Sequence, residues 1–306
     1  MRAPDRRGLG IGLAFGTAVI SGVSVFVNSY GVRAAPDPTV YTTAKNLVAA
    51  IVLMLLFLAG ARWNAPRPVP PMSPRHRLGL VTVAVIGGSV PFVLFFTGLA
   101  HASSTHAAFV HKTLVVWVAL LAVPLLGERL GSLHYMAIGL LLAGQAVLGG
   151  GLAGFRFGTG ELMILAATLL WAAEVIVVKR IVGGVPPDVL AVARMGLGVV
   201  LLLGWVAASG RWPLLTGLSA EGWRWALLTG LLLAGYVATW YRALALAPAV
   251  DVTAVLVVAA VITAALNAAV KGVSVTSEAG LGILMLLAGA ALVAAIRARP
   301  AVVPAQ

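Results

Sequence analysis

Cysteine is absent from the chain, which excludes disulfide bonds, thiolate catalysis and cysteine-ligated metal ions. Charged residues are also scarce, at 10% of the 306 residues, and only nine of them are acidic. Hydrophobic residues account for 61% of the chain, whereas roughly 45–50% is usual in soluble domains. Because a helix needs about 20 apolar residues to cross a bilayer, the length predicts about ten membrane spans and leaves no room for a soluble domain.

The scarcity of reactive groups also argues against an enzyme. An active site at membrane depth needs a nucleophile beside a base, two carboxylates or a set of metal ligands. Glu174 has no second carboxylate beside it, and His106 and His111 point too far apart around a helix to share a metal. We therefore expect no enzymatic activity, no cofactor and no metal. The net charge of +12 would suggest nucleic acid in a soluble protein, but beside membrane spans it indicates orientation in a lipid bilayer.

The apolar residues fall into segments of membrane length, which predict an all-α integral membrane protein. The first segment follows three arginines and imitates a secretory signal peptide. Its apolar run from Gly8 to Val32 exceeds the roughly 7–15 residues of a signal sequence, so we expect a retained helix. The expected spans are residues 9–32, 39–60, 77–99, 104–126, 132–153, 160–182, 187–208, 222–247, 250–272 and 276–297.

A fixed order of features occurs twice along the chain. Residues 37–45 (DPTVYTTAK), which lead into the second span, are answered by residues 186–194 (PPDVLAVAR), which lead into the seventh. The sequence therefore divides into one repeat at 8–153 and a second at 157–299. Each repeat holds five spans, and because five is odd the second repeat must cross the bilayer in the opposite sense. Inverted repeats of this kind are typical of transporters.

Basic residues are unevenly divided between the two sides of the predicted bundle. With the amino terminus inside, 12 of the 21 lysines and arginines lie on the cytoplasmic side, five lie outside and four lie within spans. This excess follows the positive-inside rule and predicts a multi-pass protein of a bacterial inner membrane with both termini in the cytoplasm. Small residues predict close helix packing, and since nothing specific indicates a dimer we expect a monomer.

Charged residues at membrane depth are costly, so each of them is a functional candidate. Lys45 and Lys112 lie about 10 Å deep in the outer leaflet, and no acidic residue shares their depth. Glu174 and Arg194 share a depth on adjacent antiparallel spans, which predicts an ion pair between them. The alternative is that Glu174 carries a coupling proton, because desolvation favours its neutral form.

Two further charges flank the turn between the eighth and ninth spans. Arg242 lies near the end of one span and Asp251 at the start of the next. Opposite charges on the two sides of a short turn predict a gate or anchor pair at the cytoplasmic face. The alternative is that Arg242 extends its side chain to the membrane interface on its own.

Polar and aromatic side chains at helical spacing are candidates for the wall of a substrate cavity. Rings at such spacing are equally consistent with packing between helices, and serines can bond their own helix backbone. The candidate substrate-binding residues are Ser21 and Ser24 on the first span, His106, His111, Lys112 and Trp117 on the fourth, Trp171 on the sixth, Tyr236 and Trp240 on the eighth, and Asn267 on the ninth.

Several short motifs resemble those of one transporter family. Residues 124–130 (PLLGERL) are followed by the glycine-spaced residues 139–144 (GLLLAG), and residues 170–173 (LWAA) and 241–245 (YRALA) add to the likeness. In these motifs the chain resembles the EamA family of the drug/metabolite transporter superfamily, over essentially its whole length. It departs from the family pattern at Ser21, where a tryptophan is common.

The resemblance implies a ten-helix basket with a central cavity lined mainly by spans 1, 3, 4, 6, 8 and 9. It also implies an exporter of amino acids, including aromatic ones, and of related small metabolites. Lys45 and Lys112 are not typical of the family's amino-acid exporters. They favour an alternative, a carrier of organophosphates or carboxylates bound by Lys112, His111 and Lys45, and a passive channel is a further possibility. A small-molecule substrate is the partner expected in each case.

Overall fold

The computed structural model describes residues 3–63, 72–102, 104–150 and 157–296, which are helical apart from short turns. Nine helical segments in this part of the chain are long and apolar enough to cross a membrane. The helices are α1 (Ala3–Ala34), α2 (Pro38–Trp63), α3 (Pro74–Ile86), α4 (Val90–His101), α5 (Ser104–Lys112), α6 (Leu114–Leu126), α7 (Ser132–Leu148), α8 (Thr159–Ile181), α9 (Pro187–Ala208), α10 (Trp212–Thr216), α11 (Ala220–Leu246), α12 (Ala249–Leu256), α13 (Ala259–Lys271) and α14 (Ser277–Ala295).

The outer surface of the bundle is apolar. Leu55, Val200 and Leu284 are 60–65% exposed, although they sit in the middle of long helices. Lipid tails cover such side chains at no cost, and the backbone satisfies its hydrogen bonds inside each helix, as a bilayer requires. The predicted fifth span is shorter than expected, because α7 ends at Leu148 after 17 residues. It packs along α14, the last helix of the second repeat.

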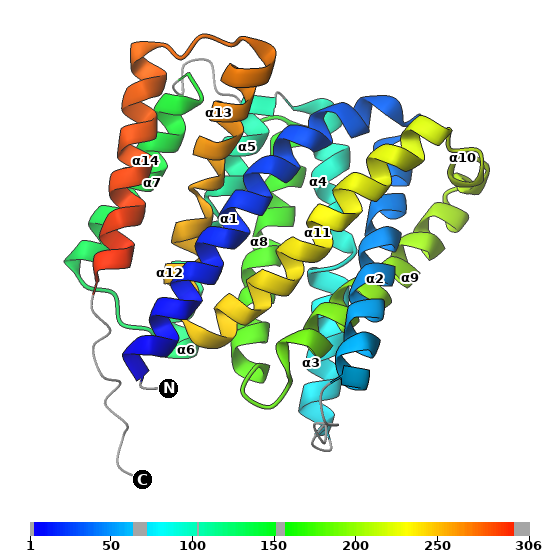
Figure 1. Ribbon diagram of the computed structural model, residues 1–306, viewed down its shortest axis with the longest axis horizontal. Helices are drawn as coiled ribbons and strands as arrows, with labels where there is room; N and C mark the ends of the chain where they lie inside the picture. Colours follow the sequence, from blue (N-terminus) through cyan, green and yellow to red (C-terminus); the bar gives the residue numbers. More distant parts are fainter. Residues whose placement is uncertain (1–2, 64–71, 103, 151–156, 297–306) are drawn as a thin grey trace.

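The contacts between helices follow an inverted two-fold pattern. In Figure 1, α1 runs upward and its counterpart α8 runs downward. The contacts of α1 with α11 and α13 in one half correspond to those of α8 with α4 and α6 in the other. The contact of α2 with α11 likewise corresponds to that of α9 with α3. The two repeats therefore interlock, and each supplies helices to both sides of the molecule.

Two equivalent spans are interrupted at the same place. The fourth span breaks at Thr113 and the ninth at Val257 and Val258. Each break is followed by a 13-residue helix, α6 or α13. Both helices end on a glycine in the left-handed region, Gly127 at φ 67° and Gly272 at φ 65°, which residues with a side chain rarely adopt. The two expected spans are present, as Ala107–Leu126 and Ala249–Lys271, and their interruptions were not predicted from the sequence. At the breaks the backbone forms hydrogen bonds between residues three apart, as in a 3₁₀ helix. One of them runs from Val116 N to Thr113 O at 2.9 Å, and such bonds wind the chain more tightly than an α-helix.

The third span is also interrupted, without a counterpart in α11. Its halves α3 and α4 are separated by Gly87, Gly88 and Ser89. Pro91 lies in the first turn of α4, and a proline has no N–H to donate to the carbonyl four residues earlier. That carbonyl belongs to Gly87, so the sequence itself leaves it free for donors from other helices.

Candidate functional site

A buried ion pair joins two helices of the second repeat. Arg194 Nη2 lies 3.3 Å from Glu174 Oε2, and the two side chains are 5% and 2% exposed. The hydroxyl of Tyr241 donates to Glu174 Oε1. The pair predicted from equal depth on α8 and α9 is therefore present, and the tyrosine of α11 is an additional partner that the sequence did not indicate.

The free carbonyl of Gly87 connects this pair to the break in the third span. Trp171 Nε1 and Arg194 Nη2 both donate to it, each at 3.1 Å. The remaining nitrogens of the guanidinium, Nε and Nη1, are buried without a hydrogen-bond partner among the described residues. Arg194 is thus held through Nη2, and its Nε and Nη1 groups remain available as hydrogen-bond donors.

An aromatic cluster lies beside Trp171. Its ring centroid is 5.6 Å from that of Phe92, 5.7 Å from Phe95 and 5.0 Å from His111. Edge-to-face contacts such as these stabilise aromatic groups beyond simple burial. The cluster brings together residues of α4, α5 and α8, and it places the candidates His111 and Trp171 in direct contact.

A small hollow lies between the two equivalent breaks. It has room for one water molecule at most. Lys112 is 9% exposed, and its ammonium makes no hydrogen bond or ion pair within the part of the chain that the structure describes. The Nδ1 atom of His111 is also buried without a partner among those residues. The lining residues are His111, Lys112, Leu114 and Val115 from the first break and Thr253, Leu256 and Val257 from the second.

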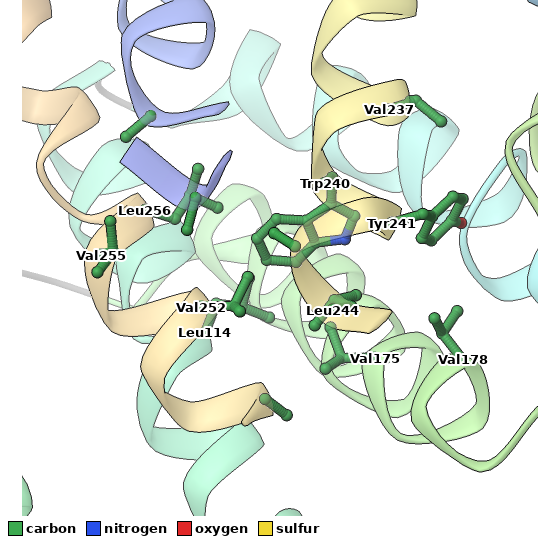
Figure 2. Packing of buried hydrophobic residues seen from close by; sticks show 14 of the residues in the cluster. Leu114, Val175, Val178, Val237, Trp240, Tyr241, Leu244, Val252, Val255 and Leu256 are labelled. Atoms are coloured by element: carbon green, nitrogen blue, oxygen red, sulfur yellow. The ribbon is translucent and has the colours of Figure 1, made fainter. Parts of the chain in front are cut away.

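Trp240 lies in the core next to this hollow. It is 3% exposed, and Figure 2 shows its indole among the apolar side chains of Leu114, Val252 and Leu256, whereas Tyr241 points the opposite way. Its ring stacks on that of Tyr236 at a centroid distance of 5.8 Å. In this conformation Trp240 is therefore a packing residue, and a contact with substrate would need the helices around it to move.

The other candidates are bonded locally and are not gathered at one point. Trp117 Nε1 donates to Thr113 Oγ1 at 3.0 Å, and Asn267 Nδ2 donates to the carbonyl of Thr263 on its own helix at 3.0 Å. Ser24 accepts from Asn28 Nδ2 at 3.0 Å. Ser21 is half-buried on α1. The side chain of His106, on α5, lies outside the described residues.

The predicted pair of Arg242 and Asp251 is wrong. Arg242 Nη2 bonds Asp188 at 2.8 Å, and both side chains are 52% exposed. Asp251 is buried and binds Arg7 at 2.7 Å, with His134 Nε2 at 3.6 Å. The two residues are near in sequence, but Arg242 lies on the exposed face of α11 and Asp251 points inward from α12, so the turn does not bring them together.

Side chains from the first repeat and from α8 seal the end of the molecule at which α1 begins, called the lower end after its place in Figure 1. Glu128 accepts from the N–H groups of Ala249 and Val250 at 2.6 and 3.2 Å, in the first turn of α12. Lys179 donates to the last carbonyls of α11, those of Leu244 and Ala247, at 2.9 and 3.0 Å. Helix ends need such partners. Residues 127–129 (GER) were noticed as a motif, but their role as a helix cap was not predicted.

Glu128 gives this seal a pH dependence. Burial raises the pKa of its carboxyl above the usual 4.5, against the opposing N–H groups of Ala249 and Val250 and the charge of Lys179. The folded protein therefore takes up this proton at a higher pH than the unfolded chain. The contribution of Glu128 to stability falls as pH rises through the folded pKa, and it recovers as pH is lowered towards 4.5.

The wild-type protein is therefore expected to gain stability relative to Glu128→Gln as the pH is lowered from about 8 to about 5. The difference between the two melting temperatures isolates this group, because all other titrations are common to both proteins. Thermal unfolding in one detergent across that range provides the measurement. A gap in melting temperature that is independent of pH would contradict the assignment.

Comparison with known proteins extends these observations. No curated protein matches the chain. A solved structure described only as the crystal structure of a protein matches with a TM-score of 0.74, at 19% identity over 92% of this chain and 95% of its own, which shows a shared fold. The model of the EamA-like transporter family matches residues 8–150 and 158–295, so it covers both repeats. The chain therefore belongs to the EamA-like transporter family.

Proposed function

We propose that the protein exports amino acids, including aromatic ones, and related small metabolites that carry a carboxylate. It does so by alternating access, as a monomer in a bacterial inner membrane with both termini in the cytoplasm. Its family consists of membrane transporters. The observation that carries the proposal is the hollow between the two equivalent breaks, with a buried lysine at its wall. Interrupted helices that meet near the middle of a bilayer commonly form the substrate site of inverted-repeat transporters.

Each break also supplies a place where the chain can bend. A short 3₁₀ stretch inside a helix is a frequent hinge, and α6 and α13 are separated from α5 and α12 by such stretches. Bending at Thr113 and Val257 would widen the hollow without breaking the ion pair of Glu174 and Arg194, which lies on other helices, α8 and α9. The two halves of the transport cycle would then use the two equivalent breaks in turn.

The chemistry around the hollow suits a carboxylate joined to an apolar or aromatic body. The ammonium of Lys112 can hold the carboxylate through charge-assisted hydrogen bonds. The ring of Trp171 contacts His111, and those of Phe92 and Phe95 contact Trp171. Together these rings offer a wall for an apolar side chain or, by cation–π contact, for an ammonium group.

A second candidate is a carrier of organophosphates or dicarboxylates. The observation that favours it is the charge of the interior. Lys45 and Lys112 are 5% and 9% exposed, and neither forms an ion pair within the described ranges. Two buried cations without carboxylate partners suit a solute with two negative charges better than a zwitterion.

Lys112→Gln is expected to slow transport of carboxylate substrates roughly tenfold or more, the value of one hydrogen bond to a charged group. Counterflow of labelled amino acids in proteoliposomes measures this, with the matching amino-acid amides as substrates that lack the carboxylate. The exposed Lys271, changed to glutamine, is the control and should transport as the wild type does. Absence of counterflow for all twenty amino acids would reject the first candidate, and uptake of a labelled organophosphate would then support the second. Equal losses for acids and amides would remove Lys112 from the site.

A further inference from the structure

Lys45 is a buried cation on α2 that reaches into the space between α1 and α4. Its Nζ lies 3.3 Å from Asn28 Oδ1 on α1 and 4.3 Å from the centroid of the Phe96 ring on α4. The side chain is 5% exposed, and it forms no ion pair with any residue that the structure describes. A lysine held only by an amide oxygen and aromatic faces keeps most of its charge uncompensated.

The surroundings of Lys45 repeat those of Arg194 in the other half of the molecule. In each repeat the second span supplies a cation and the first span supplies its acceptor: Lys45 with Asn28, and Arg194 with Glu174. In each case a tyrosine hydroxyl donates to the same acceptor, Tyr41 to Asn28 Oδ1 at 3.1 Å and Tyr241 to Glu174. The tyrosines come from different elements, α2 and α11, so the two arrangements share their kinds of group but not the positions that supply them.

The two arrangements differ in charge. The acceptor in the second repeat is a carboxylate, which cancels the charge of Arg194. The acceptor in the first repeat is a neutral amide, which leaves the charge of Lys45 in place. Asn28 is half-buried, and its Nδ2 donates to Ser24 at 2.7 Å, so its oxygen is turned towards the lysine. The first repeat therefore lacks one negative charge that the second repeat contains.

Lys45 and Arg194 both lie close to the ring of Phe92. Lys45 Nζ and the Cζ atom of Arg194 lie 5.8 and 5.9 Å from the centroid of Phe92. On α2, three residues before and one residue after Lys45, the hydroxyl of Thr42 and both polar atoms of the Asn46 amide are buried without a hydrogen-bond partner among the described residues. Buried polar groups normally have partners, and open ones call for an explanation such as a ligand.

We propose that Lys45 forms a further anion subsite for the transported solute, in addition to Lys112 at the hollow. A carboxylate or phosphate of the solute supplies beside Lys45 the negative charge that Glu174 supplies beside Arg194. Three ammonium hydrogens are available on Lys45 and only one is used by Asn28. The rings of Phe92 and Phe96 provide the adjoining wall, so the class of solute is a small organic anion with an apolar or aromatic body. This proposal rests on the transport function above.

The decisive variant is Asn28→Asp, which supplies the missing charge from the protein itself. Benzoate is the probe and benzamide is its neutral counterpart, and both are titrated into the purified full-length protein in detergent. Benzoate is expected to raise the melting temperature of the wild type and to bind the variant at least tenfold more weakly, because the new carboxylate occupies Lys45. Benzamide should bind weakly and equally to both. Without ligand, the variant should melt at a higher temperature than the wild type.

Two lysine variants complete the test. Lys45→Arg should retain benzoate binding and Lys45→Gln should lose it. Acetate and inorganic phosphate, titrated separately, distinguish a carboxylate site from a phosphate site. Equal binding of benzoate and benzamide, or benzoate affinity unchanged in Asn28→Asp, would overturn the proposal. Should Lys45→Gln fail to fold, the Asn28→Asp comparison decides alone. If benzoate binds through Lys45 but proteoliposomes transport none of the tested solutes, the proposed function fails and the anion site stands.

Discussion

Replacement of Glu174 by alanine is expected to lower the free energy of unfolding by about 3–5 kcal/mol, because it leaves a buried charge without its partner. Arg194 is 4% exposed and cannot reach water from its position between α8, α9 and the break after α3. The Tyr241 hydroxyl would lose its acceptor in the same step. Thermal and denaturant-induced unfolding of the purified variant measures the loss.

A double variant separates the charge from the packing. Replacing both members of a buried ion pair by apolar residues is often nearly neutral, so Glu174→Ala combined with Arg194→Met should recover more than half of the stability lost by the single change. Glu221→Ala, at an exposed position on α11, is the control and should stay within about 0.5 kcal/mol of the wild type. Equal losses in the single and double variants would contradict the ion pair as the cause.

Gly88→Ala is expected to have the second large effect, a destabilisation of about 3 kcal/mol or more, at the upper end of overpacking costs. A Cβ at Gly88 would run into the backbone carbonyl of Arg194. From the other side, a Cβ at Gly198 would lie 2.8 Å from the backbone of Gly88. Backbone atoms cannot give way as a flexible side chain does, so the break after α3 would be pushed off α9.

A matched control is available on α9, the helix that faces Gly88. Nothing lies within 4 Å of a Cβ built at Gly196, and alanine is the better helix former by about 0.5–1 kcal/mol, so Gly196→Ala should be neutral or slightly stabilising. The melting temperatures of the two variants in one detergent make the comparison. If Gly88→Ala and Gly196→Ala melt together, the close approach of the two backbones is not a constraint on the fold.

The overall plan of the fold followed from hydropathy and repetition. Apolar segments of about 20 residues fixed the spans, and five spans in a repeat required the inversion. The ion pair of Glu174 and Arg194 followed as well, because depth on adjacent antiparallel helices can be counted in residues. Such inferences need only the position of a residue along a helix axis, which the sequence gives directly.

The features that were not predicted from the sequence depend on the direction of a side chain or on a backbone hydrogen bond. Arg242 and Asp251 have the spacing of a pair, yet they point to different faces. The breaks at Thr113 and Val257 lie in runs that read as continuous helix, since β-branched residues are tolerated in either state. The missing N–H of Pro91 opens the carbonyl of Gly87 to Trp171 and Arg194, a backbone effect that helical spacing does not reveal.

Asn28 was not identified as a candidate at all. An amide near the end of the first span is unremarkable in sequence, and only its contact with Lys45 and Tyr41 makes it comparable to Glu174. A comparison of the two repeats by partner, rather than by residue type, would have found it. Functional differences between the halves of such proteins are therefore best sought in the groups that oppose each charge.

The seal at the lower end has a consequence for hydration. Glu128 and Lys179 close that end by binding the N–H groups of α12 and the carbonyls of α11, which are groups that water can serve equally well. A seal made of apolar contacts exposes apolar surface to water when it opens. The seal formed by Glu128 and Lys179 instead exchanges hydrogen bonds within the protein for hydrogen bonds to water. Opening at this end is therefore coupled to hydration. Water that enters replaces Glu128 and Lys179 as hydrogen-bond partners of the two helix ends, so the opened end is polar from the start.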